Sequence, residues 1–520
     1  MQVMNSPMDA SSPFDRRSFI KGSAALGLAA ATGGQGLAAE RTPGLVSSEN
    51  RKGGSDDWQL TRVRLDQRGG IRASGIEGYC SRQSVAAGET IDIMVSSQPA
   101  EDFIIEIFRT GYYGGKGARL LRTLGPFKGK TQPVPDSTMG DRHLHECRWE
   151  PSCSIKIPED WPSGVYLGRL TTLKDTTGFG YWQNYVVFIV KDDRPADICL
   201  QCSDNTWQAY NKWPSRFSVY THPKGNQGPW AMVSFDRPYG MYSQIYDNPQ
   251  SLGSGEWLCF EFPLAYWLEQ HGYDVTYCSN SDMTDPGYAR PDRFKAFISV
   301  GHDEYWDIRQ YRNVERLRDT GTNLLFLTGN AVCWVSPFSD NEAGVSHRRM
   351  FRGGPYGGDH RWAVQREENH GPFPERGPDE GYLMGSRNVS PVNGGGDWIC
   401  EKPDHWIFEG TGMKKGDAIR GMIGWEYHGD PPEDLSGLEI VARGTALQSG
   451  VNPQQWTSTI YPGPQGNFVF NASTIWWAQG MSSPPGHMLP WSHWSRPHGA
   501  DARVQRITRN LLDRAGTGGG

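Results

Sequence analysis

The sequence predicts a multidomain protein in which a β-sandwich precedes a larger α/β domain. From residue 58 to about residue 192, short segments alternate apolar and polar residues between turns rich in Gly, Pro and Asp, which is typical of sandwiches. After Asp192, apolar strands alternate with helical stretches, which favours a mostly parallel sheet flanked by helices. Because 520 residues exceed what one hydrophobic core usually organises, two domains are expected.

Three segments carry the sandwich prediction: residues 90–95, 104–108 and 185–190. Each shows the two-residue period of a half-buried strand. The phrase Trp-Pro-Ser-Gly-Val-Tyr at 161–166 places a turn before a strand, as immunoglobulin-like sandwiches often do. We therefore expect an immunoglobulin-like sandwich over residues 58–192, and we interpret the Gly-rich residues 109–115 as a structural turn rather than a binding loop.

The α/β domain is expected over residues 193–515, with a flexible tail at 516–520. Its helix candidates, 263–271 and 308–318, each lie between two apolar runs, which is the order expected of strand–helix–strand units. The strand candidates are residues 196–200, 275–277, 296–300 and 324–327.

The N-terminus matches the twin-arginine export pattern at Arg16 and Arg17. An apolar stretch follows at 24–31, and small residues continue to Ala39, so we predict a signal peptide over 1–39 and a polar linker over 40–57. The alternative is a short membrane anchor, but the stretch is too short and Gly-rich to give a stable span. We expect a periplasmic or secreted protein that the twin-arginine export machinery carries in its folded state.

Charge and cysteine content limit the partners. The formal net charge of -6 comes without a basic stripe, so we expect no nucleic-acid partner. The nine cysteines are odd in number, so at least one stays unpaired within the chain. Cys199 and Cys202 form a CxxC pattern without a second pair at zinc-site spacing, and we interpret them as a buried strand end. A disulfide between Cys147 and Cys153 after export stays open.

Polar residues follow two of the predicted strands at the points where they end. His302, Asp303 and Glu304 come after strand 296–300, and Asn330 comes after strand 324–327. If the two strands are neighbours, their ends present His302, Glu304 and Asn330 to one crevice, where open α/β sheets bind ligands. The alternative interpretation is that these acids cap the following helix.

An ordered set of motifs resembles a known family. Between about residues 196 and 427 the chain is similar to the large (beta) subunit of N,N-dimethylformamidase. The motifs that carry the resemblance are, in order, Tyr210, Tyr220, Arg237-Pro238, His302-x-Glu304-Tyr305-Trp306, Gly329-Asn330 and Gly424-Trp425-Glu426.

The resemblance implies a flavodoxin-like, glutamine-amidotransferase-like α/β domain and a hydrolase of non-peptide C–N bonds acting on a small-molecule amide. It implies a mononuclear ferric ion, Fe(3+), held by Tyr210, Tyr220 and Glu304, all hard oxygen donors suited to such a cation. It also implies proton transfer by His302 or Glu426 and orientation of the substrate by Asn330. A homo-oligomer or a small partner subunit stays open.

The chain departs from the family pattern near the proposed ligands. Trp207 stands in place of a tyrosine, Asp303 stands in place of a proline, and the connection between Tyr210 and Tyr220 is short. We therefore expect a rebuilt pocket wall and a different substrate.

Two other functions stay open at this point. One is a secreted carbohydrate- or cell-wall-binding protein with a non-catalytic α/β domain. The other is a metal-free amidotransferase-like hydrolase, which ranks last because Cys259, Cys278 and Cys333 lack the context of a nucleophile elbow.

Overall fold

The computed structural model of the chain groups Pro43–Gly520 into one compact unit. The predicted signal peptide and the first residues of the predicted linker lie outside the described residues. The structure describes residues 44–66, 71–135, 140, 142–174, 178, 180–215, 217–220, 232–242, 248–357, 375–389, 394–448, 451–491 and 495–519.

Two sheets make up the N-terminal part, as the alternating segments predict. Their apolar side chains form a common core that includes Ile93, Ile105 and Val186, so the sheets pack face to face. The three-stranded antiparallel sheet has the order β1 (Glu77–Cys80), β3 (Thr90–Ser96), β6 (Cys153–Lys156). The five-stranded sheet has the order β2 (Ser84–Ala86), β8 (Gln183–Lys191), β7 (Gly164–Thr172), β4 (Phe103–Thr110), β5 (Ala118–Phe127).

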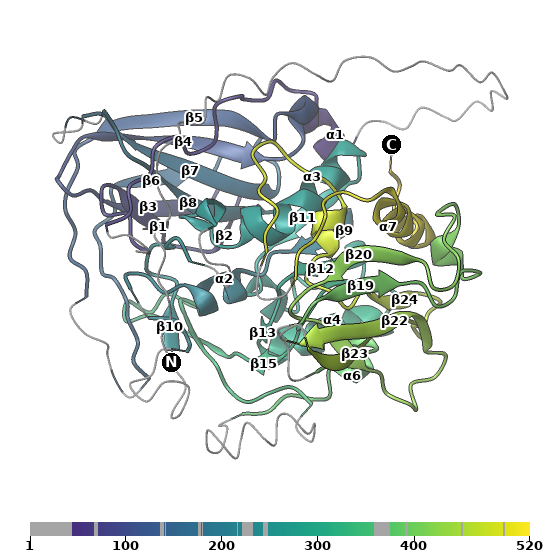
Figure 1. Ribbon diagram of the computed structural model, residues 1–520. Coiled ribbons are helices and arrows are strands. Elements are labelled where there is room, and N and C mark those ends of the chain that lie inside the picture. Colours follow the sequence, from purple (N-terminus) through teal and green to yellow (C-terminus); the bar gives the residue numbers. More distant parts are fainter. Residues whose placement is uncertain are drawn as a thin grey trace, which may run out of the picture. The chain divides into compact units, whose positions relative to one another are not determined.

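The second part is built on a seven-stranded mixed sheet, whose teal strands β9, β11 and β12 and green strands β22 and β23 are visible in Figure 1. Its first five strands are parallel, which confirms the four predicted strands and the parallel arrangement. The order is β11 (Val275–Cys278), β9 (Ala196–Gln201), β12 (Phe294–Gly301), β14 (Asn323–Thr328), β24 (Phe468–Asn471), β23 (Asn452–Pro462), β22 (Glu439–Gln448).

Both predicted helices are present, as α3 and α4. A π-helix, η3 (Trp257–Glu261), leads directly into α3, and π-turns of this kind often occur near functional sites. The α-helices are α1 (Leu45–Asn50), α2 (Asp204–Tyr210), α3 (Phe262–Gln270), α4 (Ile308–Asp319), α6 (Gly381–Met384) and α7 (Ala502–Arg514). The 3₁₀ turns are η1 (Tyr113–Gly115), η2 (Pro249–Ser251), η4 (Asp282–Thr284), η5 (Trp406–Phe408) and η6 (Trp477–Gly480).

Short strands complete the larger part. They form a three-stranded sheet and three pairs: β10 (Met232–Ser234), β17 (Arg349–Phe351) and β16 (Phe338–Ser339); β13 (Tyr305–Trp306) with β15 (Trp334–Val335); β18 (Arg387–Asn388) with β21 (His428–Asp430); β19 (Gly396–Ile399) with β20 (Ala418–Ile423). The predicted boundary near residue 192 stays a prediction, since one apolar cluster includes Phe108 and Leu167 of the sandwich together with Leu200 of the large sheet.

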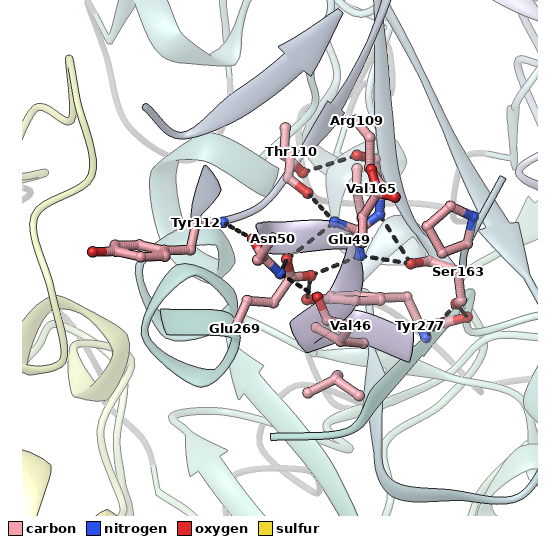
Figure 2. A network of polar contacts seen from close by, with 12 residues as sticks. Val46, Glu49, Asn50, Arg109, Thr110, Tyr112, Ser163, Val165, Glu269 and Tyr277 are labelled. Atoms are coloured by element: carbon pink, nitrogen blue, oxygen red, sulfur yellow. Dashed lines mark hydrogen bonds and ion pairs between the residues drawn. The ribbon is translucent and has the colours of Figure 1, made fainter. Parts of the chain in front are cut away.

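A buried ion pair ties the sandwich to α3 (Figure 2). Arg109 of β4 donates to both carboxylate oxygens of Glu269, at 2.8 and 3.0 Å, and neither side chain is exposed. The Tyr277 hydroxyl donates to the same carboxylate at 2.8 Å. Removing one partner of a buried pair typically costs about 3–5 kcal/mol, because the other charge stays buried. Arg109, the first residue of segment 109–115, therefore has a structural role.

Part of the predicted linker is helical, so its interpretation as an aperiodic segment was wrong. The polar residues of α1 are partners of the same network: Asn50 donates to Glu269 at 2.8 Å, and its side-chain oxygen accepts the Tyr112 N–H at 2.8 Å (Figure 2). Glu49 is buried and pairs with Arg119 at 2.6 Å. Composition suggested a solvated linker because nothing in the sequence reveals these distant partners.

The structure also tests the predictions for the cysteines and for the C-terminal tail. All nine cysteines are free thiols, including Cys147 and Cys153. Cys199 lies 3.5 Å from Cys278 on the neighbouring strand, sulfur to sulfur, and is buried as predicted. The tail was expected to be frayed, but the Gly518 N–H donates to the Asp197 carboxylate at 3.2 Å, which anchors it.

Candidate metal centre

The candidate site begins where β12 ends. Gly301 has a φ of 73°, and a Cβ there would lie 2.8 Å from the Cβ of Phe260, so the strand can stop and turn only at a glycine. In the register of β12 and β14, Gly301 lies opposite Thr328. The residues that follow both strands therefore emerge at the same edge of the sheet, which confirms that the two predicted strand ends are neighbours.

The helix-capping alternative does not hold. Helix α4 begins at Ile308, and its N-cap is Asp307, whose side chain accepts the Arg309 N–H at 2.8 Å. Asp303 is turned into the protein and accepts hydrogen bonds from Asn280 at 3.0 Å and Ser299 at 2.8 Å. His302 and Glu304 are thus free of any capping role.

Glu304 is the centre of the cluster. Its carboxylate accepts from the hydroxyl of Tyr210 at 2.7 Å, from that of Tyr220 at 3.4 Å, and from the indole N–H of Trp334 at 2.8 Å. Its backbone N–H donates to Thr206 at 3.0 Å. The carboxylate is 3% exposed, so its orientation is set by protein groups rather than by solvent.

The two tyrosines come from one tight excursion of the chain. Tyr210 ends α2, the helix that follows β9, and the Val219 N–H donates back to the Ala209 carbonyl at 3.0 Å. This return brings the Tyr220 hydroxyl within 3.1 Å of the Tyr210 hydroxyl. The Tyr220 hydroxyl also forms a hydrogen bond with the hydroxyl of Tyr305.

A buried histidine joins Glu304 to a second glutamate. His302 Nε2 lies 2.6 Å from Glu426 Oε2 and 3.2 Å from Glu304 Oε2, and its Nδ1 faces Glu256 at 3.7 Å. His302, Glu304 and Glu426 offer ligand atoms within 4.8 Å of one another, which is a possible metal site.

Asn330 lies close to this group through the backbone. A Cβ at Gly329 would lie 2.1 Å from the Glu426 carbonyl oxygen, so the end of β14 presses against the segment that carries Glu426. Asn330 itself takes a φ of 53° and is 7% exposed. The structure thus brings together five of the six predicted site residues through direct contacts, and it places Asn330 beside them.

Electrostatics favour a cation among these oxygens. Burial and the charge of Glu304 raise the pKa of Tyr210 well above its ordinary value and that of Tyr220 to about 12. Burial alone would raise the pKa of Glu304, but the hydrogen bond and charge of His302 hold it below its ordinary value. Both phenols therefore keep their protons and donate hydrogen bonds to one carboxylate. A bound cation would take the place of those protons. The residues fit a metal ion with hard oxygen ligands.

For His302, burial and the neighbouring charges act on the pKa in the opposite directions. Burial would lower its pKa, but the charge of Glu426 and the contacts with Glu256 and Glu304 hold the pKa well above its ordinary value. The ring therefore carries a proton between carboxylates and can pass one from either nitrogen.

The buried carboxyl group of Asp204, at the start of α2, predicts how the stability of the fold depends on pH. Burial raises its pKa to about 8, although its carboxylate accepts the Asn280 N–H at 2.7 Å. The folded state thus keeps a proton that the unfolded chain loses near pH 4, so stability should fall as pH rises toward 8, by roughly 1.4 kcal/mol per unit. In Asp204→Asn, the amide oxygen can still accept that bond, and the part of the fall that Asp204 causes should disappear, so the pH dependence becomes shallower.

The test for Asp204 is the melting temperature of both proteins from pH 6 to 8. Burial also raises the pKa of Asp303 to about 6 and that of Glu380 to about 7, but both groups are present in both proteins, so their contributions cancel in the comparison. Parallel pH curves for wild type and Asp204→Asn would contradict the assignment.

Four residues of the site were missed by sequence reasoning. Glu256 and Arg352, whose guanidinium lies over the Tyr220 ring, lie in irregular segments without a motif. Trp334 looks like any apolar residue of a short strand. Tyr305 stands inside the quoted His-x-Glu-Tyr-Trp motif, so that motif was the only available signal for it.

Comparison with known families decides the relationship. The family model described as N,N-dimethylformamidase beta subunit-like, C-terminal, matches residues 104–490. The chain belongs to this family. The match begins in β4 of the sandwich and includes all six predicted site residues, so it extends beyond the region of resemblance at 196–427. A comparison with curated proteins found no match.

Membership of the dimethylformamidase beta subunit-like family indicates a hydrolase, as the motif order predicts. The model of the twin-arginine translocation signal matches residues 13–33, which confirms export to the periplasm or beyond. Among the described residues, no helix has both the length and the apolar character needed to cross a bilayer.

Proposed function

We propose that this exported protein hydrolyses a non-peptide C–N bond of a small amide at a mononuclear ferric ion held by Tyr210, Tyr220 and Glu304. The observation that carries the proposal is the convergence of two phenol oxygens on one buried carboxylate, at 2.7 and 3.4 Å. Membership of the family supports the reaction class.

Two donor sets share Glu304, and chemistry favours one for a ferric ion. Two phenolates and a carboxylate give three anionic oxygen ligands, which match a hard trivalent cation. His302, Glu304 and Glu426 instead resemble the nitrogen and oxygen sets of divalent ions such as zinc. We assign the tyrosine set, which leaves His302 and Glu426 for proton transfer.

The ferric ion, when bound, supplies a Lewis acid that polarises the amide carbonyl and lowers the pKa of water. Glu426 Oε2 takes a proton from the attacking water, and the protonated His302, whose Nε2 lies 2.6 Å from that oxygen, gives its proton to the leaving nitrogen and is then reprotonated by Glu426. Asn330 orients the substrate through its amide group. Water adds to the carbonyl carbon, the C–N bond breaks, and the products are a carboxylic acid and an amine.

The binding-protein alternative has little support from the sandwich. Its Trp149 and Trp161 side chains are buried, and the half-buried rings of Tyr181 and Trp182 already lie under the Arg62 guanidinium, at 5.5 and 6.0 Å, so these rings are poor platforms for a sugar. Protein that binds no metal in the following experiment would favour this alternative.

The experiment measures iron content and the visible spectrum of protein purified after export. A phenolate bound to ferric iron transfers electron density to the metal, so the wild type should be coloured and should release amine from small amides. Tyr210→Phe and Tyr220→Phe each remove one anionic oxygen and keep the ring, so the colour and iron content should both fall.

Tyr277→Phe is the matched control, because Tyr277 also donates to a buried carboxylate, that of Glu269, at 2.8 Å. It should keep colour and iron. Wild type without stoichiometric metal would overturn the proposal and favour the binding protein. Iron that survives both tyrosine substitutions but is lost in His302→Ala would move the ion to the histidine set.

A further inference from the structure

A buried arginine lies on two aromatic rings of the proposed metal centre. Arg352 follows β17 directly, and its side chain is 0% exposed. The centre of its guanidinium lies 4.3 Å from the ring centroid of Tyr220 and 4.7 Å from that of Trp334. Tyr220 is a proposed ligand, and Trp334 donates to the third ligand, Glu304, at 2.8 Å. One cation thus lies over two rings, and the polar group of each ring donates a hydrogen bond to Glu304.

This position has an electrostatic consequence. A cation over a ring is attracted to the π-electrons, and the attraction grows where water is excluded. A phenolate spreads part of its negative charge into its ring, so the effect on Tyr220 is larger once the phenol has lost its proton.

We propose that Arg352 is a positioning residue of the metal centre, which fixes the Tyr220 ring and sets how much electron density this phenolate gives to the ion. The inference rests on the proposed function, since it takes Tyr220 as a ligand. It adds a residue outside the proposed ligand set that acts through the face of the Tyr220 ring.

The planar guanidinium suits this role better than a lysine would. It lies flat on an aromatic ring, whereas a lysine ammonium is a compact, strongly hydrated point charge. Arg352→Lys therefore keeps the charge and loses the stacking, and Arg352→Gln loses both. Comparing the two variants therefore separates the effect of the positive charge from the effect of stacking on the ring.

The experiment is the visible spectrum and iron titration of the full-length exported protein. The positive charge stabilises the electrons of the Tyr220 phenolate, so its removal lowers the energy needed to move one to the metal. Arg352→Gln should shift the absorption maximum to longer wavelength and weaken iron binding by roughly 10- to 100-fold, as outer-shell substitutions typically do. Arg352→Lys should shift the maximum less.

Arg348→Gln is the matched control. Arg348 is also buried and lies over the Phe235 ring at 5.9 Å, and its hydrogen bonds go to Asp236, Gln83 and the carbonyls of Cys80 and Phe235 rather than to a proposed ligand. Its loss should leave the absorption maximum unchanged.

An unshifted maximum in Arg352→Gln with iron bound would overturn the inference. So would an equal shift in Arg348→Gln, since that would reflect general loosening of the fold. If Arg352→Gln binds no iron at all, Arg352→Lys decides, and a maximum identical to wild type there, with undiminished iron affinity, counts against the inference. A colourless wild type without iron would mark failure of the proposed function itself.

Discussion

Glu304→Gln should leave the exported protein without metal and without measurable hydrolase activity. Glu304 belongs to both donor sets, because its carboxylate contacts Tyr210 at 2.7 Å and His302 at 3.2 Å. Neutralising it therefore removes an anionic ligand whichever set holds the ion. Substitutions outside the ligand shell already cost roughly 10- to 100-fold in metal affinity, so this loss should be larger.

Glu261→Gln is the control for Glu304→Gln. Glu261 is also buried, and it also accepts an indole N–H, that of Trp207, at 2.6 Å. Burial raises its pKa well above its ordinary value, so the amide imitates a carboxyl that is already neutral. Iron content, melting temperature and amine release should match wild type in the control. Full iron content in Glu304→Gln would remove Glu304 from the site.

The strand ends were the part of the site that the sequence could predict. Strand 324–327 is a continuous apolar run, strand 296–300 is apolar except for Ser299, and polar residues follow each abruptly. Parallel pairing then places His302 and Asn330 at one edge without further information. Local periodicity and the geometry of parallel sheets were sufficient for this step.

The ligands could not be predicted in the same way. Tyr210 and Tyr220 have the residue type and spacing of ordinary packing aromatics, and only the resemblance to a family set them apart. What distinguishes them is tertiary, since both hydroxyls meet on Glu304, which lies more than eighty residues away in the chain. No property of the segment 204–220 carries that information.

The same limit explains the linker and the missed residues. Asn50 looked solvated because its partner, Glu269, lies 219 residues away. Arg352 likewise reaches Tyr220 only through folding. Sequence patterns indicate which face of an element is buried, but they do not indicate which distant polar groups meet there.

His302→Ala should reduce turnover by roughly 100- to 10,000-fold while the iron and its colour stay. In the proposed site, His302 is beside the ion and moves protons, and general acid–base catalysis typically contributes a factor of this size. The measurements are the rate of amine release at saturating substrate and the iron content per chain. Loss of iron in proportion to activity would instead make His302 a ligand.

A double variant shows whether His302 acts together with Glu426. The two side chains lie 2.6 Å apart, so removal of either should disable the same proton transfer. Glu426→Gln should then reduce turnover about as much as His302→Ala, and the double variant should reduce it little further, because residues that act as a unit are not additive. If the two losses multiply instead, each residue serves a separate step, and the shared proton transfer that we assign to this pair is wrong.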